Sequence, residues 1–453
     1  MRFLPHSKDD IAAMLQTVGV DSLDALIAHI PAELRERAAI KLAPGLSESE
    51  VSSEMSALAE KNRGIDGRTS FLGAGYYRHY IPAAVRAITS RAEFATAYTP
   101  YQAEASQGTL QAIFEFQTLV SQLTGMEIAN ASMYDGASAA AEAVLMARRL
   151  KPDRHRVVVS RALWPDYRAA IHTYLSAFET IEILEAPFDR QNGMVDLAEL
   201  ERLADASLLC VVSGYPNMFG VIEPLARVSA ITHAAGGITI SSTAEPLALG
   251  LLKPPSELGV DIAVGEAQSF GLPLQYGGPG LGFMATQAAR MRQIPGRLVG
   301  ETHDSRGQRC FCLTLATREQ HIRRERATSN ICTNHSLCAL AATVYLSLMG
   351  RQGLRELAAR NVELAHHAAD QLGRAGVYTS FSGPFFNEFV ISVSDVAAAL
   401  DSAESEGVLA GVPLGRDYPE LADGLLVSVT EMNDAKQISR LCAALRGGDG
   451  ERE

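Results

Sequence analysis

The sequence predicts an α/β fold with a large, mainly parallel sheet domain, a smaller C-terminal α/β domain and an N-terminal helical arm. From about residue 105, short apolar strands alternate with helical stretches, and several strands are apolar on both faces, as in a buried parallel sheet. A second group of strands follows a long helix near the C-terminus. We expect the arm at 1–65, the large domain at 66–325, the small domain at 326–445 and a frayed tail at 446–453.

The first sixty residues carry helix signals. Ser7 is a candidate N-cap for a helix with an apolar stripe that stops at Gly19. The segment SLDALIAHIP repeats the pattern, and Pro31 is expected to end its helix. Ser47 and Glu50 form a capping-box pattern ahead of a third helix. Such an arm fits two roles, wrapping a partner subunit or covering the sheet of its own chain.

The two sheet domains are predicted from apolar strands and the helices between them. A helix over Leu110–Leu123 is closed by Gly125, and a helix over Glu319–Arg326 precedes a long helix bent at Gly350. The expected strands lie at Arg156–Ser160, Leu208–Gly214, Ile238–Ser241, Asp261–Val264 and Leu281–Met284 in the large domain, and at Glu388–Val393 and Leu425–Val429 in the small domain.

The composition and charge of the chain argue against several classes of protein. The net charge of −12 argues against binding to nucleic acid or to a membrane surface, because both need a basic face. No apolar run approaches the ~20 residues that span a bilayer, and the N-terminus lacks the apolar stretch of a secretory signal, so we expect a cytoplasmic protein. The six cysteines lie in apolar runs without zinc-site spacing, which predicts buried, reduced thiols and no metal site.

One basic cluster, REQHIRRER over Arg318–Arg326, admits two interpretations. It is either a solvated helix face paired with Glu319 and Glu325, or an anchor for an acidic partner or a phosphate.

The segment SMYDGASAAAEA places Asp135, Gly136, Ala137 and Ser138 just ahead of an alanine-rich helix. Free backbone N–H groups at a helix start, beside small residues, can hold a phosphate. An ordinary N-cap formed by Asp135 or Ser138 explains the same residues. On its own, the motif favours the N-cap.

Two loops are candidate ligand-contacting segments. In FATAYTPYQAEASQG, Tyr98, Tyr101 and Gln102 flank Pro100, which favours an extended loop that lines a site or a subunit contact; packing of the tyrosines in the core is the alternative. In SGYPNMFGVIEP, Asn217 follows a strand end and is either a polar ligand contact or a turn residue.

The segment AVGEAQSFGLPLQYGGPGLG follows a buried strand with a polar exit and a glycine-rich turn. In α/β folds that hold pyridoxal phosphate (PLP), this exit carries the lysine that forms the Schiff base. Here the position is Gln268, and the six lysines of the chain all lie elsewhere. An amide cannot replace the imine-forming amine.

Four segments together resemble one family, the P-protein of the glycine cleavage system, which is glycine dehydrogenase (decarboxylating). They are AYTPYQAEASQGTLQAIFEFQTLVSQLTGMEIANASMYDGASAAAEA, GYPNMFG, LLKPPSELGVDIAVGEAQSFGLPLQYGGPGLGF and TREQHIRRERATSNICT, and the similarity runs from about Phe71 to beyond Asn334. In this family the P-protein is one long chain of two homologous halves or a pair of subunits. This chain has about half the long form's length and is similar to the N-terminal half, subunit 1 or the alpha subunit.

The resemblance implies a fold type I PLP-dependent transferase whose own cofactor pocket is degenerate. The lysine belongs to subunit 2, in a histidine–lysine pair that aligns with Ala267 and Gln268. Ser242 stands where a carboxylate would pair with the cofactor's ring nitrogen, and Trp164 stands at the position that stacks on the ring. The degenerate pocket would thus comprise Gly136, Ala137, Ser138, Trp164, Ser242 and Gln268.

The resemblance also implies partners. Glycine is decarboxylated on PLP held by subunit 2 in an α2β2 heteromer, and the aminomethyl group passes to the lipoyl arm of the H-protein. This chain alone is expected to bind no PLP covalently and to supply no catalytic residue, whereas Tyr98, Tyr101 and Gln102 are candidates for lining the shared site. The alternatives are a purely structural scaffold and a free-standing aminotransferase-like enzyme, which would require a lysine in the pocket.

Overall fold

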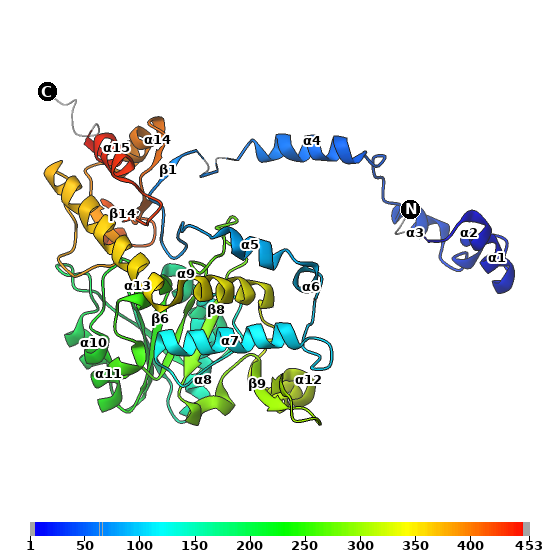
Figure 1. Cartoon of the computed structure of the whole chain (residues 1–453), viewed down its shortest axis with the longest axis horizontal. Coiled ribbons are helices and arrows are strands. Elements are labelled where there is room, and N and C mark those ends of the chain that lie inside the picture. Colours follow the sequence, from blue (N-terminus) through cyan, green and yellow to red (C-terminus); the bar gives the residue numbers. More distant parts are fainter. Residues whose placement is uncertain (1–4, 63, 66, 447–453) are drawn as a thin grey trace. The chain divides into compact units, whose positions relative to one another are not determined.

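The computed structural model describes residues 5–62, 64–65 and 67–446, and the chain divides into two units, Met1–Gly64 and Ile65–Glu453 (Figure 1). Over the described part, no helix is long and apolar enough to cross a membrane. The expected frayed tail lies, from residue 447 onward, outside the described residues.

Four short helices form the first unit. Ser7 and Ser47 cap their helices with capping boxes to Asp10 and Glu50, as predicted. The expectation for Pro31 is wrong, because the second helix ends at Leu26 and Pro31 instead precedes the third. None of the residues described in these helices is buried, so their apolar side chains are open to solvent. The helices are α1 (Lys8–Val18), α2 (Leu23–Leu26), α3 (Ala32–Arg37) and α4 (Glu48–Ala59).

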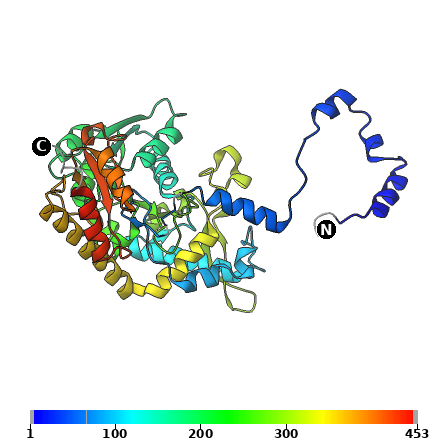
Figure 2. The same cartoon turned by 90° about the horizontal axis from the view of Figure 1, so that it is seen from above.

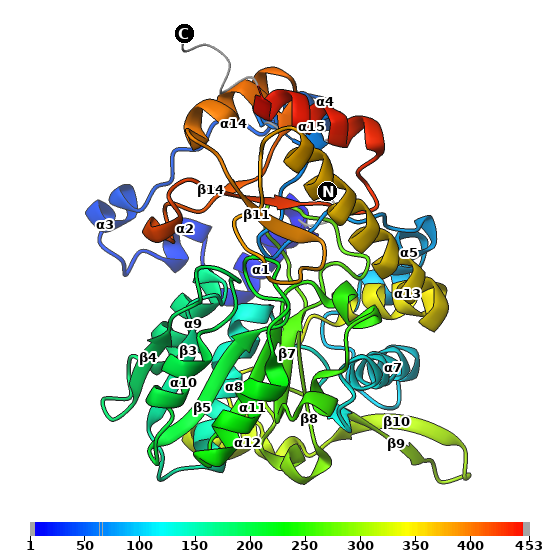
Figure 3. The same ribbon diagram turned by 90° about the vertical axis from the view of Figure 1, so that its left-hand side faces the viewer.

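A seven-stranded sheet forms the centre of the second unit, in the order β2-β8-β7-β6-β5-β3-β4 (Figure 3). The pairs from β4 through β7 are parallel, whereas β8 runs antiparallel to both β7 and β2. The predicted mainly parallel sheet is confirmed. The strands are β2 (Ile128–Ala129), β3 (Arg156–Ser160), β4 (Glu182–Ala186), β5 (Leu208–Gly214), β6 (Ile238–Thr243), β7 (Ile262–Glu266) and β8 (Gly282–Thr286).

Helices cover both faces of this sheet because its strands are apolar on both sides. Val157 and Val159 of β3 point into the core shared with α8 and α9, whereas Val158 points into the core shared with α10 and α11. Helix α7 ends at Gly125, which has a φ of +69°, as its sequence predicts. The helices are α7 (Gln107–Thr124), α8 (Gly136–Leu150), α9 (Pro165–Leu175), α10 (Leu197–Leu203) and α11 (Leu225–Ala234).

Helix α13 (Ser336–Arg374) bends at Gly350, where φ is 58° and ψ is −178°, which confirms the predicted bend (Figure 2). The part of α13 before the bend shares a core with α7. The later part packs against a three-stranded antiparallel sheet with the order β11-β14-β13. A short parallel pair joins β1 to β12. These elements are β1 (Thr69–Ser70), β11 (Glu388–Ser392), β12 (Val408–Leu409), β13 (Val412–Pro413), β14 (Gly424–Ser428), α14 (Val396–Ser405) and α15 (Ala435–Arg446).

Some elements differ from the predictions. The edge strand β4 was not predicted, because glutamates 182 and 185 break its apolar pattern. The helix expected over Glu319–Arg326 is wrong: only Gln320–Arg323 (α12) is α-helical, because Arg324 has a φ of +52°. Glu319 also pairs with Arg297, at 3.1 Å, and not with the cluster's arginines. Further elements that were not predicted include α5 (Ala83–Thr89), α6 (Ala92–Ala95) and the hairpin of β9 (Leu298–His303) and β10 (Arg309–Thr314).

The cysteines only partly match the prediction. All six are free thiols, but only Cys210 and Cys442 are buried, and Cys332 is exposed. The expectation of buried thiols is therefore wrong for Cys332. Among the described residues, no group of His, Cys, Asp or Glu side chains is arranged to hold a metal ion.

A buried ion cluster ties three distant segments of the second unit together. His79 lies between Glu245, 2.8 Å from its Nε2, and Glu431, 2.8 Å from its Nδ1. Glu431 also accepts a hydrogen bond from Asn361 of α13. Burial acts to lower the pKa of His79, but the two carboxylates outweigh it and raise the pKa to about 10.

Replacing His79 by glutamine should destabilise the fold, because it leaves two carboxylates without their cation; breaking a buried pair costs about 3–5 kcal/mol. The raised pKa means that His79 stabilises the wild type fully below pH 6.5, and that this stabilisation is lost as the pH rises through about 10. Urea unfolding at pH 6, 8 and 10 checks both points. The gap between wild type and His79→Gln should narrow toward pH 10, and a constant gap would refute the ion cluster.

Candidate functional site

The residues expected to form a degenerate pocket lie near the C-terminal ends of the parallel strands. Strands β6 and β7 are parallel neighbours, so their C-terminal ends meet beside the start of α8, which packs on both strands. All of the expected residues except Ala137 are buried. Gly136, Ala137 and Ser138 begin α8, Trp164 precedes α9, Ser242 lies on β6, and Gln268 follows β7.

Gln268 is a fully engaged structural side chain. It is 2% exposed, its Oε1 accepts the N–H of Tyr77 at 3.0 Å, and its Nε2 donates to the carbonyl of Leu272 at 2.7 Å. Both ends of the amide are thus used within the chain. Gln268 anchors the loop before α5 to the turn after β7, and its amide nitrogen has no nucleophilic lone pair for imine chemistry.

The start of α8 is an N-cap, as the sequence motif on its own favours. The Asp135 carboxylate accepts the N–H of Ser138 at 2.7 Å in a capping box. The N–H of Gly136, however, donates to Glu266 at 3.0 Å, and Glu266 belongs to none of the predicted site residues. Glu266 ends β7 two residues before Gln268; an acidic residue that closes an apolar strand is the signal that could have revealed it.

Trp164 and Ser242 are buried polar residues whose side chains lack partners. Within the described structure, neither Trp164 Nε1 nor Ser242 Oγ has a hydrogen-bond partner. The Trp164 ring packs against Tyr167 at a centroid distance of 5.4 Å. Gly75 covers the indole so closely that a Cβ there would lie 3.4 Å from it. The Trp164 ring is therefore closed in by the chain itself.

The three residues expected to line a shared site differ in their surroundings. Tyr98 is 95% exposed and Gln102 is also exposed. Tyr101 is partly buried: its hydroxyl donates to Asn334, and the Arg297 guanidinium lies 4.3 Å from its ring centroid. Tyr101 thus anchors the loop, and Tyr98 and Gln102 are the side chains that the loop presents outward.

The segment that holds Tyr101 also reaches the pocket. Next to Asn334, His335 Nδ1 lies 2.7 Å from the carbonyl of Gly280, in the turn after Gln268. Its backbone N–H donates to Ser132 Oγ at 3.1 Å. Contacts of Tyr101, Asn334 and His335 therefore connect the loop of Tyr98 to the pocket, and they hold this loop against the rest of the unit.

Asn217, the other loop candidate, is a turn residue. It is 1% exposed, and its Oδ1 accepts the N–H groups of Phe219 and Val221. Its Nδ2 donates to Glu223 at 2.8 Å. With every polar atom used inside the turn, Asn217 is not available to a ligand.

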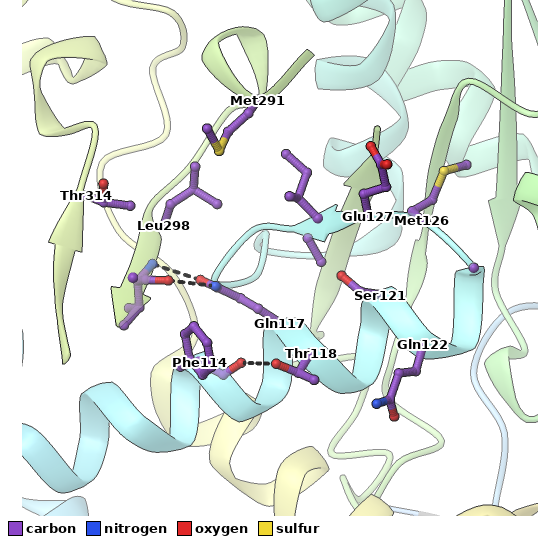
Figure 4. Close-up of a pocket in the computed structure, with 15 residues that line it drawn as sticks. Phe114, Gln117, Thr118, Ser121, Gln122, Met126, Glu127, Met291, Leu298 and Thr314 are labelled. Atoms are coloured by element: carbon purple, nitrogen blue, oxygen red, sulfur yellow. Dashed lines mark hydrogen bonds between the residues drawn. The ribbon is translucent and has the colours of Figure 1, made fainter. Parts of the chain in front are cut away.

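A separate cavity of about 480 Å³ lies between α7, β2 and β9 (Figure 4). The Gln117 side chain lines this cavity. Its Nε2 donates to the carbonyl of Val299 at 3.0 Å, and its Oε1 accepts the N–H of Val299 at 2.9 Å. The one ionisable side chain of its lining is Glu127, whose carboxylate accepts the N–H of Ala288. The cavity is lined by none of the sequence-predicted site residues and brings together no acid–base set.

Comparison with known proteins identifies the family. The family model of the glycine cleavage system P-protein matches residues 1–445. The probable glycine dehydrogenase (decarboxylating) subunit 1 of Geobacillus kaustophilus is 49% identical over 450 residues, which cover 99% of this chain and 99% of that protein. The protein of the same name from Anaeromyxobacter dehalogenans is 49% identical over 449 residues, covering 98% and 100%.

Solved structures agree. A crystal structure of glycine decarboxylase (P-protein) of the glycine cleavage system, in inhibitor-bound form, superposes with a TM-score of 0.90 at 42% identity and covers 98% of this chain and 99% of that one. Sphingosine-1-phosphate lyase of Burkholderia pseudomallei, 18% identical with a TM-score of 0.67 over 90% of this chain and 92% of its own, shares the fold. These matches confirm the predicted PLP-dependent transferase fold type I. The chain belongs to the glycine cleavage system P-protein family.

Proposed function

We propose that this chain is subunit 1 of a two-subunit glycine dehydrogenase (decarboxylating), which works only together with a second subunit. Full-length relatives named subunit 1 support this assignment. The single observation that carries the dependence on a partner is Gln268, which stands at the lysine position with both ends of its amide engaged.

The residues of the pocket do not fit a PLP of their own. Gln268 cannot form the imine, and Ser242 offers no carboxylate for the ring nitrogen. The N–H groups of Gly136 and Ser138 at the start of α8, which could hold a phosphate, already bind Glu266 and Asp135. We therefore assign no step of the reaction to this pocket and place the PLP on subunit 2.

The contribution of this chain, in our proposal, is the outer face of the loop that carries Tyr98 and Gln102. Both side chains are exposed, on a loop that Tyr101 fixes to the rest of the unit. A rigid, amphipathic aromatic side chain suits a wall that excludes water from a neighbouring site. We infer an α2β2 assembly in the cytoplasm in which this wall faces glycine on subunit 2 and leaves access for the lipoyl H-protein.

The proposed domain boundaries remain those expected from the sequence, with the arm at 1–65, the large domain at 66–325 and the small domain at 326–445. A separate core formed by the later part of α13 and by β11 and β14 supports a small domain, although Phe71 also belongs to this core and β1 pairs with β12. The helical arm, whose described side chains are unburied, suits a segment that packs on subunit 2.

A purely structural role for this chain is the alternative. It would bring no residue near the chemistry, and the exposed tyrosine would serve assembly alone. A free-standing aminotransferase-like enzyme is disfavoured, because it requires a lysine at position 268.

Tyr98→Ala should lower the rate of glycine–bicarbonate exchange by the reconstituted complex at least about tenfold, since it opens the wall to water. Because Tyr98 is 95% exposed, the stability of the isolated chain should change by less than about 0.5 kcal/mol. Exchange assays and size-exclusion chromatography of wild-type and variant complexes check the outcome. Unchanged exchange with normal assembly would exclude the lining role, and weakened assembly with normal turnover would select the scaffold.

Tyr101→Phe should have the opposite effects, lowering the stability of the chain and leaving the exchange rate of the complex nearly unchanged. It removes the hydroxyl that bonds Asn334 and Thr333, so the chain should lose about 1 kcal/mol of stability while the aromatic wall remains. Urea unfolding of the isolated chain, with the exchange assay on the complex, measures both effects. A larger loss of exchange for Tyr101→Phe than for Tyr98→Ala would reverse the roles assigned to the two tyrosines.

A further inference from the structure

A buried carboxylate occupies the N-terminus of α8. Glu266 is 1% exposed, and its two oxygens accept three backbone N–H groups from three segments. Oε2 accepts from Gly136 at 3.0 Å, and Oε1 accepts from Leu281 at 2.6 Å and from Gln268 at 3.1 Å. The donors belong to the first turn of α8, to the entry of β8 and to the exit of β7.

This arrangement is what an anion-binding site requires. The first turn of a helix offers N–H groups without intrahelical partners and the positive end of the helix dipole. The start of α8 is buried, so an N–H left without an acceptor there would cost free energy. Glu266 supplies that acceptor from within the chain.

The site has no spare space around this carboxylate. A Cβ at Gly280 would lie 2.9 Å from Glu266 Oε2 and 2.9 Å from the hydroxyl of Tyr76. A Cβ at Gly136 would lie 2.0 Å from the hydroxyl of Tyr167. Two glycines thus let backbone approach the carboxylate from both sides, as glycines do where a backbone binds a phosphate.

Two further residues of the expected pocket, Trp164 and Ser242, carry buried donors without partners in the described part of the chain. Trp164 packs on Tyr167, whose hydroxyl faces Gly136, and the buried indole N–H of Trp164 has no hydrogen-bond partner within the described residues. The same holds for the buried hydroxyl of Ser242 on β6. Buried donors without partners are expected where a polar ligand, not protein, would complete the hydrogen bonds.

We propose that Glu266 is a built-in occupant of a phosphate-type anion site, so that its carboxylate takes the place of an external anion and closes the pocket. Removing the side chain should turn the closed pocket into a binding site for inorganic phosphate. The ionised carboxylate carries the negative charge that the N–H groups and the helix dipole favour, whereas burial opposes that charge and raises the pKa of Glu266 to about 7.

The test compares the full-length wild type with Glu266→Ala in thermal unfolding, with and without inorganic phosphate at equal ionic strength. Phosphate also stabilises proteins non-specifically, so the measured quantity is the rise in the melting midpoint of the variant minus that of the wild type. We expect a saturable excess rise of roughly 1–3 °C, because binding to the folded state alone stabilises it.

Glu223→Ala is the matched control. Glu223 is also buried, with a pKa raised to about 7 by burial, but its carboxylate contacts Asn217 and the N–H of Val195, outside the first turn of any helix described here. Its removal should lower the midpoint without creating a response to phosphate. An equal phosphate response of Glu223→Ala would overturn the proposal, because any cavity left by a buried glutamate would then suffice.

Failure of Glu266→Ala to show an excess rise also overturns the proposal. If this variant refolds in phosphate but not with sucrose, which also stabilises proteins non-specifically, that dependence supports the site; refolding in both would overturn the proposal. If it refolds in neither buffer, the same measurement on Glu266→Ser decides, because serine leaves nearly the same space and keeps one polar atom. No phosphate-dependent rise in Glu266→Ser would overturn the proposal.

Discussion

The hydrogen bonds of one buried carboxylate organise the centre of this chain. Glu266 joins the end of β7, the start of α8 and the entry to β8, and Gln268, two residues later, joins the same strand end to the loop before α5. A buried charge is tolerated only with such partners, since its loss of hydration costs several kcal/mol. The hydrogen bonds of Glu266 fix where β7, α8 and the glycine-rich turn meet. The space at the C-terminal end of β7 is therefore filled by protein.

A filled pocket and an outward-facing loop fit our proposal that this chain serves as a subunit without a cofactor of its own. Internal hydrogen bonds of Gln268 and Glu266 hold much of the degenerate pocket, whereas the buried Trp164 Nε1 and Ser242 Oγ have no partner among the described residues. In our proposal, the functional surface is the loop of Tyr98, which is fixed to the rest of the unit through Tyr101, Asn334 and His335. We therefore propose that stability and contact with the partner are carried by different residues of neighbouring segments.

Local chemistry allowed much of the fold to be predicted. Strands β3 and β5, the end of α7 at Gly125 and the bend at Gly350 follow from apolar runs and glycine alone. The prediction of a helix over Glu319–Arg326 is wrong, because the sequence pattern does not reveal the positive φ of Arg324. In the site, the absent lysine is visible at Gln268. Glu266 is visible only as an acidic residue that ends an apolar strand, and its role is not, because two of its donors lie 130 and 15 residues away in the chain.

We propose that this chain holds no PLP and that the cofactor belongs to its partner. The most direct test is the PLP content of the purified complex with the second subunit, measured by alkaline release of the cofactor and compared with the molar amount of each subunit. We expect one PLP per pair of subunits, with none in this chain purified alone. Two PLP molecules per pair, or an aldimine band from this chain by itself, would contradict it.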